Sequence, residues 1–191
     1  MRTFIAIELS AQIHESLAQI QAHLKYSGAD VKWVENNNIH LTLKFLGEVD
    51  DKKVEEVKAN LEAIAKETRP FEITLKDVGA FPKIDYPRVI WAGLDKGVQE
   101  SKVLAEKIDE ALSGIGFEKE ARPFAAHLTI GRVRSPKNKA ALKEKILSLH
   151  STSYAACPKQ SINSIFLFQS TLTPSGSIYT KLHEALLQRV I

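Results

Sequence analysis

The sequence has only one cysteine, Cys157, in 191 residues. A disulfide within the chain is therefore excluded, and a cytoplasmic location is the default expectation. A lone cysteine is more often a structural or surface residue than a catalytic thiol, and we expect Cys157 to be one of these.

Long apolar runs are also missing. No stretch approaches the ~20 residues that a membrane-spanning helix needs, so we expect no membrane partner. The first segment, MRTFIAIELS, is typical of a strand and lacks the length and cleavage site of a signal peptide. No low-complexity or linker-like stretch divides the chain, and we expect one domain over residues 1–191.

The chain is rich in the residues that build a core. Hydrophobic residues make up 44% and charged residues 26%, which is typical of a globular protein. The net charge is +3, a mild excess that permits an anionic partner without requiring one.

Apolar periodicity predicts an alternation of strands and helices. Ser10 is placed to cap the first helix, and the acidic residues at the start of DDKKVEEVKANLEAIAKE favour a helix there. We expect strands at 3–9, 38–47, 71–81, 88–94, 125–133, 161–172 and 177–187, and helices at 11–26, 50–67, 99–112 and 138–150.

One short phrase occurs twice in this order of elements. His-Leu-Thr-apolar begins at His40 and again at His127, and 127 − 40 = 87 residues separate the copies. With 6 His in the chain, we expect roughly 0.05 such phrases by chance. Together with the repeated element order, the pair indicates a duplication. The fold class that follows is α+β: a bilobal, pseudo-twofold arrangement of two mainly antiparallel sheets facing a central cleft, with helices on the outer faces.

The phrase places its polar residues on one face of a strand. Alternation puts His40 with Thr42, and His127 with Thr129, while their apolar neighbours face the helices. Two such faces across a groove would bring two imidazoles and two hydroxyls together. One imidazole can remove a proton while the other donates one, and hydroxyls suit anionic oxygens. This combination favours in-line displacement at phosphorus, with Arg132, or Lys44 beside the first copy, as the nearby cation.

Two other interpretations of a histidine pair have less support. A metal site would need further ligands, but no carboxylate lies at ligand spacing from either histidine. A serine hydrolase would need a nucleophile-elbow pattern, which the sequence lacks. We therefore expect no metal and no cofactor.

Several spaced segments resemble one known family. MRTFIAIEL, WVENNNIHLTLKFLGEV, FPKIDYPRVIWAGL, FAAHLTIGRVR and STLTPSGSIYTKL are similar, in that order, to the RNA 2′,3′-cyclic phosphodiesterases. These enzymes, also called 2′-5′ RNA ligases, belong to the two-histidine phosphoesterase superfamily. The resemblance implies hydrolysis of RNA 2′,3′-cyclic phosphate ends to 2′-phosphates, and in some members reversible 2′-5′ ligation, without metal or cofactor.

The resemblance also implies roles for individual residues. His40 and His127 would be the acid and the base, in that order, although near-symmetry allows the reverse. Thr42, Thr129 and Arg132 would contact phosphate. Phe45 matches an aromatic that stacks on a base, but strict alternation would turn it away from His40, so a bulge must intervene or Phe45 belongs to the core.

Other residues leave alternatives open. A basic rim at Arg134, Lys137 and Lys139 would hold RNA phosphates or simply be solvated. Tyr179 and Lys181 would approach the cleft from the last strand. The expected partner is an RNA end with a cyclic phosphate, tRNA fragments among them, and the expected state is a monomer. The alternatives are a phosphodiesterase for small cyclic nucleotides and a non-catalytic RNA-binding protein.

Overall fold

The computed structural model describes residues 1–150, 158–174 and 176–188, so Cys157 lies outside the described residues. In this part of the chain, strands and helices alternate as the sequence predicts. The strands are β1 (Arg2–Ile7), β2 (Val31–Trp33), β3 (Leu41–Glu48), β4 (Phe71–Ile73), β5 (Leu75–Lys83), β6 (Tyr86–Leu94), β7 (His127–Val133), β8 (Gln160–Ile162), β9 (Ser164–Thr173) and β10 (Gly176–Leu186). The helices are α1 (Ala11–Lys25), the short 3-10 helix η1 (Asn36–Asn38), α2 (Asp51–Lys66), α3 (Val98–Ser113) and α4 (Lys139–His150).

Capping residues explain where two of the helices begin. The Ser10 side chain accepts a hydrogen bond from the Ile13 backbone N–H at 3.3 Å, and Asp50 does the same for Lys53 at 2.8 Å. Each cap satisfies a donor that the first helical turn leaves without a partner. The predicted cap at Ser10 is confirmed.

Two four-stranded sheets form the centre of the fold. Sheet A has the order β10-β9-β1-β3, and sheet B has the order β2-β7-β6-β5, with every pairing antiparallel. Three strands of each sheet are equivalent: β9-β1-β3 corresponds to β5-β6-β7. The fourth strand differs, because sheet A gains β10 beside β9 and sheet B gains β2 beside β7. A small third sheet pairs β4 with β8.

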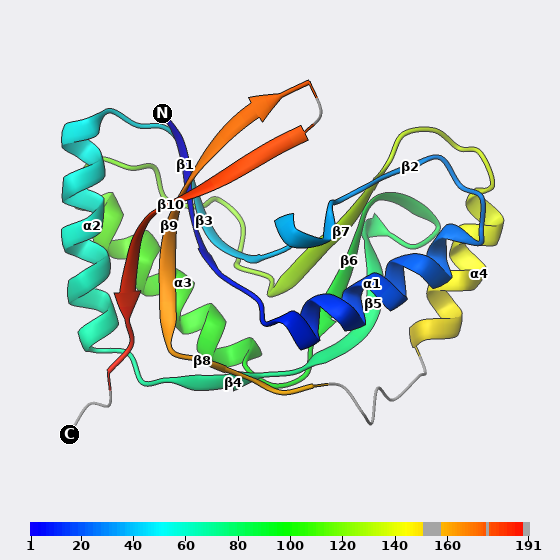
Figure 1. The fold of residues 1–191 in the computed structure, drawn as a ribbon, viewed down its shortest axis with the longest axis horizontal. Coiled ribbons are helices and arrows are strands. Elements are labelled where there is room, and N and C mark those ends of the chain that lie inside the picture. The colour runs from blue at the N-terminus through cyan, green and yellow to red at the C-terminus, as the bar shows by residue number, and fades with distance from the viewer. Residues whose placement is uncertain (151–157, 175, 189–191) are drawn as a thin grey trace.

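Helices cover one face of each sheet. In Figure 1, α2 and α3 lie on the left beside sheet A, and α1 and α4 lie on the right beside sheet B. The contacts agree, since α2 touches β9 and β10, α3 touches β3, and α4 touches β5. This arrangement confirms the predicted α+β duplication with helices on the outer faces.

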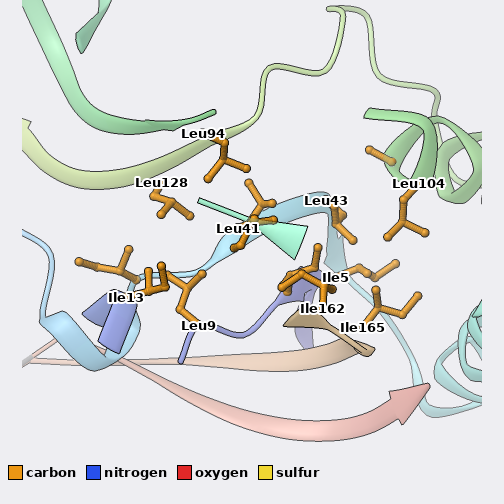
Figure 2. Close-up of a cluster of buried hydrophobic side chains, with 14 of the residues drawn as sticks. Ile5, Leu9, Ile13, Leu41, Leu43, Leu94, Leu104, Leu128, Ile162 and Ile165 are labelled. Atoms are coloured by element: carbon orange, nitrogen blue, oxygen red, sulfur yellow. The ribbon is translucent and has the colours of Figure 1, made fainter. Parts of the chain in front are cut away.

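The main core lies between the sheets and their helices. Figure 2 shows Leu41 and Leu43 of β3 and Leu128 of β7 in the same apolar cluster as Ile5 and Ile13. These leucines alternate with the polar residues of the two repeated phrases, as predicted. Burying the apolar side of each phrase stabilises the fold and fixes which way its polar side faces.

The structure differs from the predicted elements in several places. The predicted strand 71–81 is divided into β4 and β5, and 161–172 into β8 and β9, because the chain passes from the small sheet to a large one. The gap left between the predicted strands 71–81 and 88–94 is a tight connection, since β5 and β6 extend into it. Strand β2 was not predicted, because three residues are too few to show a period. Among the described residues, no helix has the length and apolar character needed to cross a membrane.

Candidate active site

His40 lies immediately before β3, between η1 and the strand. Its Nδ1 is 2.9 Å from the backbone carbonyl oxygen of Asn38. The Asn38 side-chain amide in turn donates to the Ser177 carbonyl of β10 at 2.8 Å. The segment that carries His40 is therefore tied to the far edge strand of sheet A.

His127 opens β7 and repeats this arrangement. Its Nδ1 is 2.7 Å from the carbonyl oxygen of Ala125, again two residues earlier in the chain. A carbonyl only accepts, so in both histidines Nδ1 carries the proton and donates it. Nε2 is then the nitrogen with the lone pair in each neutral imidazole. In both rings, Nε2 is therefore the nitrogen that can act on a substrate.

Strand register places each threonine with its histidine. On sheet B, His127 lies opposite Gly93 and Thr129 opposite Trp91, two positions apart on β6. Residues two apart on a strand share a face, and directly opposite residues share it too. On sheet A, His40 precedes the first paired residue of β3, and Thr42 lies opposite Ala6, which shares a face of β1 with Phe4, the ring that stacks on His40. Both threonines are half-buried, and β3 and β7, which carry the two copies, contact each other.

A β-bulge follows each copy of the phrase at the same point. On β3, Leu43 is the extra residue, because Thr42 lies opposite Ala6 and Lys44 lies opposite Ile5. On β7, the extra residue is Ile130, because Thr129 lies opposite Trp91 and Gly131 lies opposite Ile90. A bulge shifts the alternation by one residue. The fifth residue after each histidine therefore returns to the face of that histidine.

The two residues that the bulges turn toward the site are Phe45 and Arg132, again 132 − 45 = 87 positions apart. Phe45 lies opposite Phe4, with ring centroids 6.1 Å apart, and its side chain is 62% exposed. It also lines a cavity with the 116–120 loop. Phe45 is therefore not a core residue. Arg132 is exposed and lies opposite Val89, on the same face as Trp91 and Thr129.

Lys44 does not take the place expected of it. The bulge buries its side chain to 3% exposure on the side away from Phe45. The ammonium lies 2.5 Å from Asp109 Oδ1 of α3 and donates to the Glu118 carbonyl at 2.8 Å. Lys44 is thus neutralised by α3 and by the 116–120 loop, and the expectation that it offers a cation to the phosphate was wrong.

Aromatic rings surround His40. Phe4 stacks on it at 4.6 Å, Phe168 lies parallel at 6.4 Å, and Tyr179 meets it edge-on at 5.3 Å. These rings exclude water, and burial lowers the pKa of His40 from 6.5 to about 4, against the smaller opposing effect of the hydrogen bond to Asn38. His40 is therefore neutral at pH 7 in the substrate-free protein.

The ring contacts of His127 are different. Phe81 of β5 meets its imidazole edge-on at 5.0 Å. Phe81 also lies 5.4 Å from Trp91, whose indole occupies the space that a Cβ at Gly79 would need. The wall behind His127 is therefore built from one large ring over a glycine, with the ring on β6, whereas at the matching position of sheet A the ring is Phe166 of β9 and lies opposite Ala6 of β1.

Sequence reasoning identified some of these neighbours and missed others. Tyr179 does reach His40, as its position after the last turn predicts. Lys181 lies on the same face of β10, opposite Phe168, and forms an ion pair with Glu8 at 2.7 Å. The roles of Phe4 and Asn38 were missed. The position of Phe4 follows from the pairing of β1 with β3 and β9, which no local pattern records. The role of Asn38 depends on how the chain turns between η1 and β3.

No cluster of three or more His, Cys, Asp or Glu side chains is placed to hold a metal ion within residues 1–150, 158–174 and 176–188. Of the remaining histidines, His183 lies on β10, with Nε2 2.8 Å from Glu62 of α2. It faces the helical side of sheet A and takes no part in the site.

A duplicated α+β fold that presents one His-x-Thr strand from each half is the architecture of the two-histidine phosphoesterases. The chain belongs to the LigT-like phosphoesterase family, whose model matches residues 7–91 and again residues 94–179. The two matches begin 94 − 7 = 87 residues apart, which is the spacing of the two histidines.

Relatives match nearly the full length of the chain. The RNA 2′,3′-cyclic phosphodiesterase of Methanocaldococcus jannaschii is 40% identical over 96% of this chain and 99% of its own. The protein of the same name from Aquifex aeolicus is 35% identical over 96% of both chains. The apo structure of Escherichia coli LigT has a TM-score of 0.76, with 26% identity and 98% of both chains covered.

Proposed function

We propose that this protein hydrolyses 2′,3′-cyclic phosphates at RNA ends to 2′-phosphates. The observation that carries the proposal is the repeated unit around His40 and His127. Each histidine has its Nδ1 proton held by a main-chain carbonyl, its Nε2 left for a substrate, and a threonine on its face. The names of the full-length relatives support the choice of substrate.

The reaction needs one base, one acid and donors for the phosphate oxygens. One Nε2 removes a proton from water, and the water oxygen attacks phosphorus. The bond from phosphorus to the ribose 3′-oxygen breaks, and the second imidazole donates a proton to that oxygen. The hydroxyls of Thr42 and Thr129 and the guanidinium of Arg132 hold the non-bridging oxygens as negative charge increases. The exposed ring of Phe45 stacks on the terminal base.

The same groups support joining. If a 5′-hydroxyl replaces water, the base removes its proton and the product is a 2′-5′ linkage. Hydrolysis and ligation therefore depend on the same two histidines, and the supply of 5′-hydroxyl ends decides between them.

The assignment of acid and base follows from the protonation of His40. The resemblance makes His40 the acid, but its lowered pKa leaves it neutral at pH 7, which suits a base. A bound phosphate anion would have to raise that pKa by about three units, equivalent to about 4 kcal/mol, for His40 to act as an acid at neutral pH. If His40 is the base, its protonation makes kcat/KM fall below about pH 4. If His40 is the acid, its deprotonation makes kcat/KM fall as the pH rises above its pKa.

The test compares two substrates in the presence of a chelator: a 2′,3′-cyclic mononucleotide and an oligoribonucleotide with a cyclic phosphate end. We expect the product to be a 2′-phosphate and the rate to be insensitive to chelation. His40→Ala and His127→Ala should each reduce turnover by at least a hundredfold while preserving the circular dichroism spectrum. Full activity in either variant would refute the mechanism, and oligonucleotide binding without turnover would favour a non-catalytic RNA-binding protein.

A further inference from the structure

Strand β2 is the one element of sheet B that the duplication does not explain. It pairs with β7 on the side away from β6, and Lys32 lies directly opposite Arg132. Directly opposite residues of an antiparallel pair project from the same face, with Cβ atoms about 5 Å apart. Since Arg132 shares the face of Thr129, Lys32 lies on that face too.

The pair carries two positive charges without a visible counter-charge. Both side chains are exposed, and neither forms an ion pair in the described part of the chain, whereas Lys44, Lys53 and Lys143 each pair with a carboxylate. Like charges directly opposite each other destabilise a sheet. The next residues outward, Asp30 and Arg134, are adjacent through a 2.9 Å backbone hydrogen bond and carry opposite charges. The excess positive charge is thus concentrated at Lys32 and Arg132.

We propose that Lys32 and Arg132 bind the phosphodiester that precedes the cyclic phosphate in an RNA chain. The proposal rests on the function proposed above and refines it, because it makes an oligonucleotide the preferred substrate over a mononucleotide. An anion between the two side chains removes their repulsion and accepts charge-assisted hydrogen bonds from both.

The spacing fits two successive phosphates. Thr129 and Arg132 lie opposite residues two apart on β6, which corresponds to about 7 Å along the strand. This is the scale of one nucleotide step. The guanidinium of Arg132 has five N–H donors, enough to reach toward both phosphates. Lys32 lies one strand farther out, so only the upstream phosphate is within its range.

The experiment compares Lys32→Gln with the wild type on a cyclic-phosphate-ended dinucleotide and on the 2′,3′-cyclic mononucleotide of the same terminal base. We expect kcat/KM to fall about tenfold on the dinucleotide and less than about twofold on the mononucleotide. The slope of log kcat/KM against log salt concentration for the dinucleotide should decrease in magnitude by about 0.7. The control, Lys66→Gln at the end of α2, removes the same charge from the far side of the molecule and should change neither value.

Two further variants separate charge from structure. Lys32→Arg should restore the preference for the dinucleotide. Lys32→Glu should abolish that preference without lowering the melting temperature, because it replaces a like-charge pair with an ion pair to Arg132. Equal loss on both substrates, or no loss on either, would overturn the proposal.

Binding of single-stranded RNA tests Lys32 independently of turnover. If the wild type turns over neither substrate, the proposed function is wrong, and Lys32 is then tested through the affinity of a short single-stranded RNA measured by fluorescence anisotropy. Lys32→Gln should weaken that binding and reduce its salt dependence. Unchanged affinity and salt dependence would exclude this phosphate site independently of catalysis.

Discussion

Acidification should destabilise this protein through His40. The folded-state pKa of about 4 lies below the ordinary value of 6.5, because Phe4, Phe168 and Tyr179 bury the imidazole. Between these two values the unfolded chain binds a proton that the folded protein does not. The stability from neutral His40 is therefore complete above pH 6.5 and is lost as the pH falls toward 4.

The pKa difference sets the size of this effect. A difference of 2.5 units costs about 2 kcal/mol by pH 5 and about 3 kcal/mol by pH 4. His14, whose pKa is also lowered by burial, contributes with the same sign. The effect of His40 is isolated by comparing the wild type with His40→Gln, which is neutral at every pH.

Two measurements check this prediction. Urea unfolding gives the free energy of unfolding at pH 7 and at pH 4. Its decrease between these two pH values should be smaller by about 3 kcal/mol in His40→Gln than in the wild type. An NMR titration should show one imidazole with a pKa near 4 that disappears in the variant. Identical pH dependence in both proteins, or a His40 pKa above 6, would refute the reasoning from ring burial.

Other substitutions test the bulges and what they expose. Asp109→Ala leaves the buried ammonium of Lys44 without its carboxylate and should lower the free energy of unfolding by about 3 kcal/mol, whereas Lys44→Met should cost little; a small loss in the first variant would mean that water reaches the lysine. Gly131→Ala places a Cβ 2.8 Å from Val31 Cγ1 and should cost about 1–3 kcal/mol by displacing β2; an unchanged melting temperature would show that β2 moves freely. Phe45→Ala should change the free energy of unfolding by no more than about 0.5 kcal/mol but reduce kcat/KM about tenfold through lost stacking. A large loss of stability with unchanged kcat/KM would indicate that Phe45 is a core residue.

The pattern of apolar and polar residues was enough to predict the duplication. His40, Thr42, His127 and Thr129 alternate with leucines and isoleucine that enter the core, so the sequence already records which face is polar. The long amphipathic helices and the cap at Ser10 were predictable for the same reason, since the pattern and the cap lie within one segment of chain.

What could not be predicted depends on pairing between distant segments. Strict alternation would place Lys44 on the histidine face of β3 and Phe45 on the core side with Leu41, yet the bulge at Leu43 turns Lys44 inward and returns Phe45 to the histidine face. The sequence signalled that an irregularity was needed there but not which residue would be extra. Lys32 was missed because its position follows only from the register of β2 on β7.

The main-chain carbonyls that hold the two imidazoles have a consequence for how this site withstands mutation. Where a side chain orients a catalytic histidine, a single substitution removes the orienting group. Here Asn38 and Ala125 contribute only their peptide oxygens to the rings, and every residue type supplies that atom. Removing a side chain therefore leaves both carbonyls in place, although at position 38 it also removes the amide that binds the Ser177 carbonyl. Only a change that redirects the backbone, such as an inserted or deleted residue, would take the carbonyls themselves away from the rings.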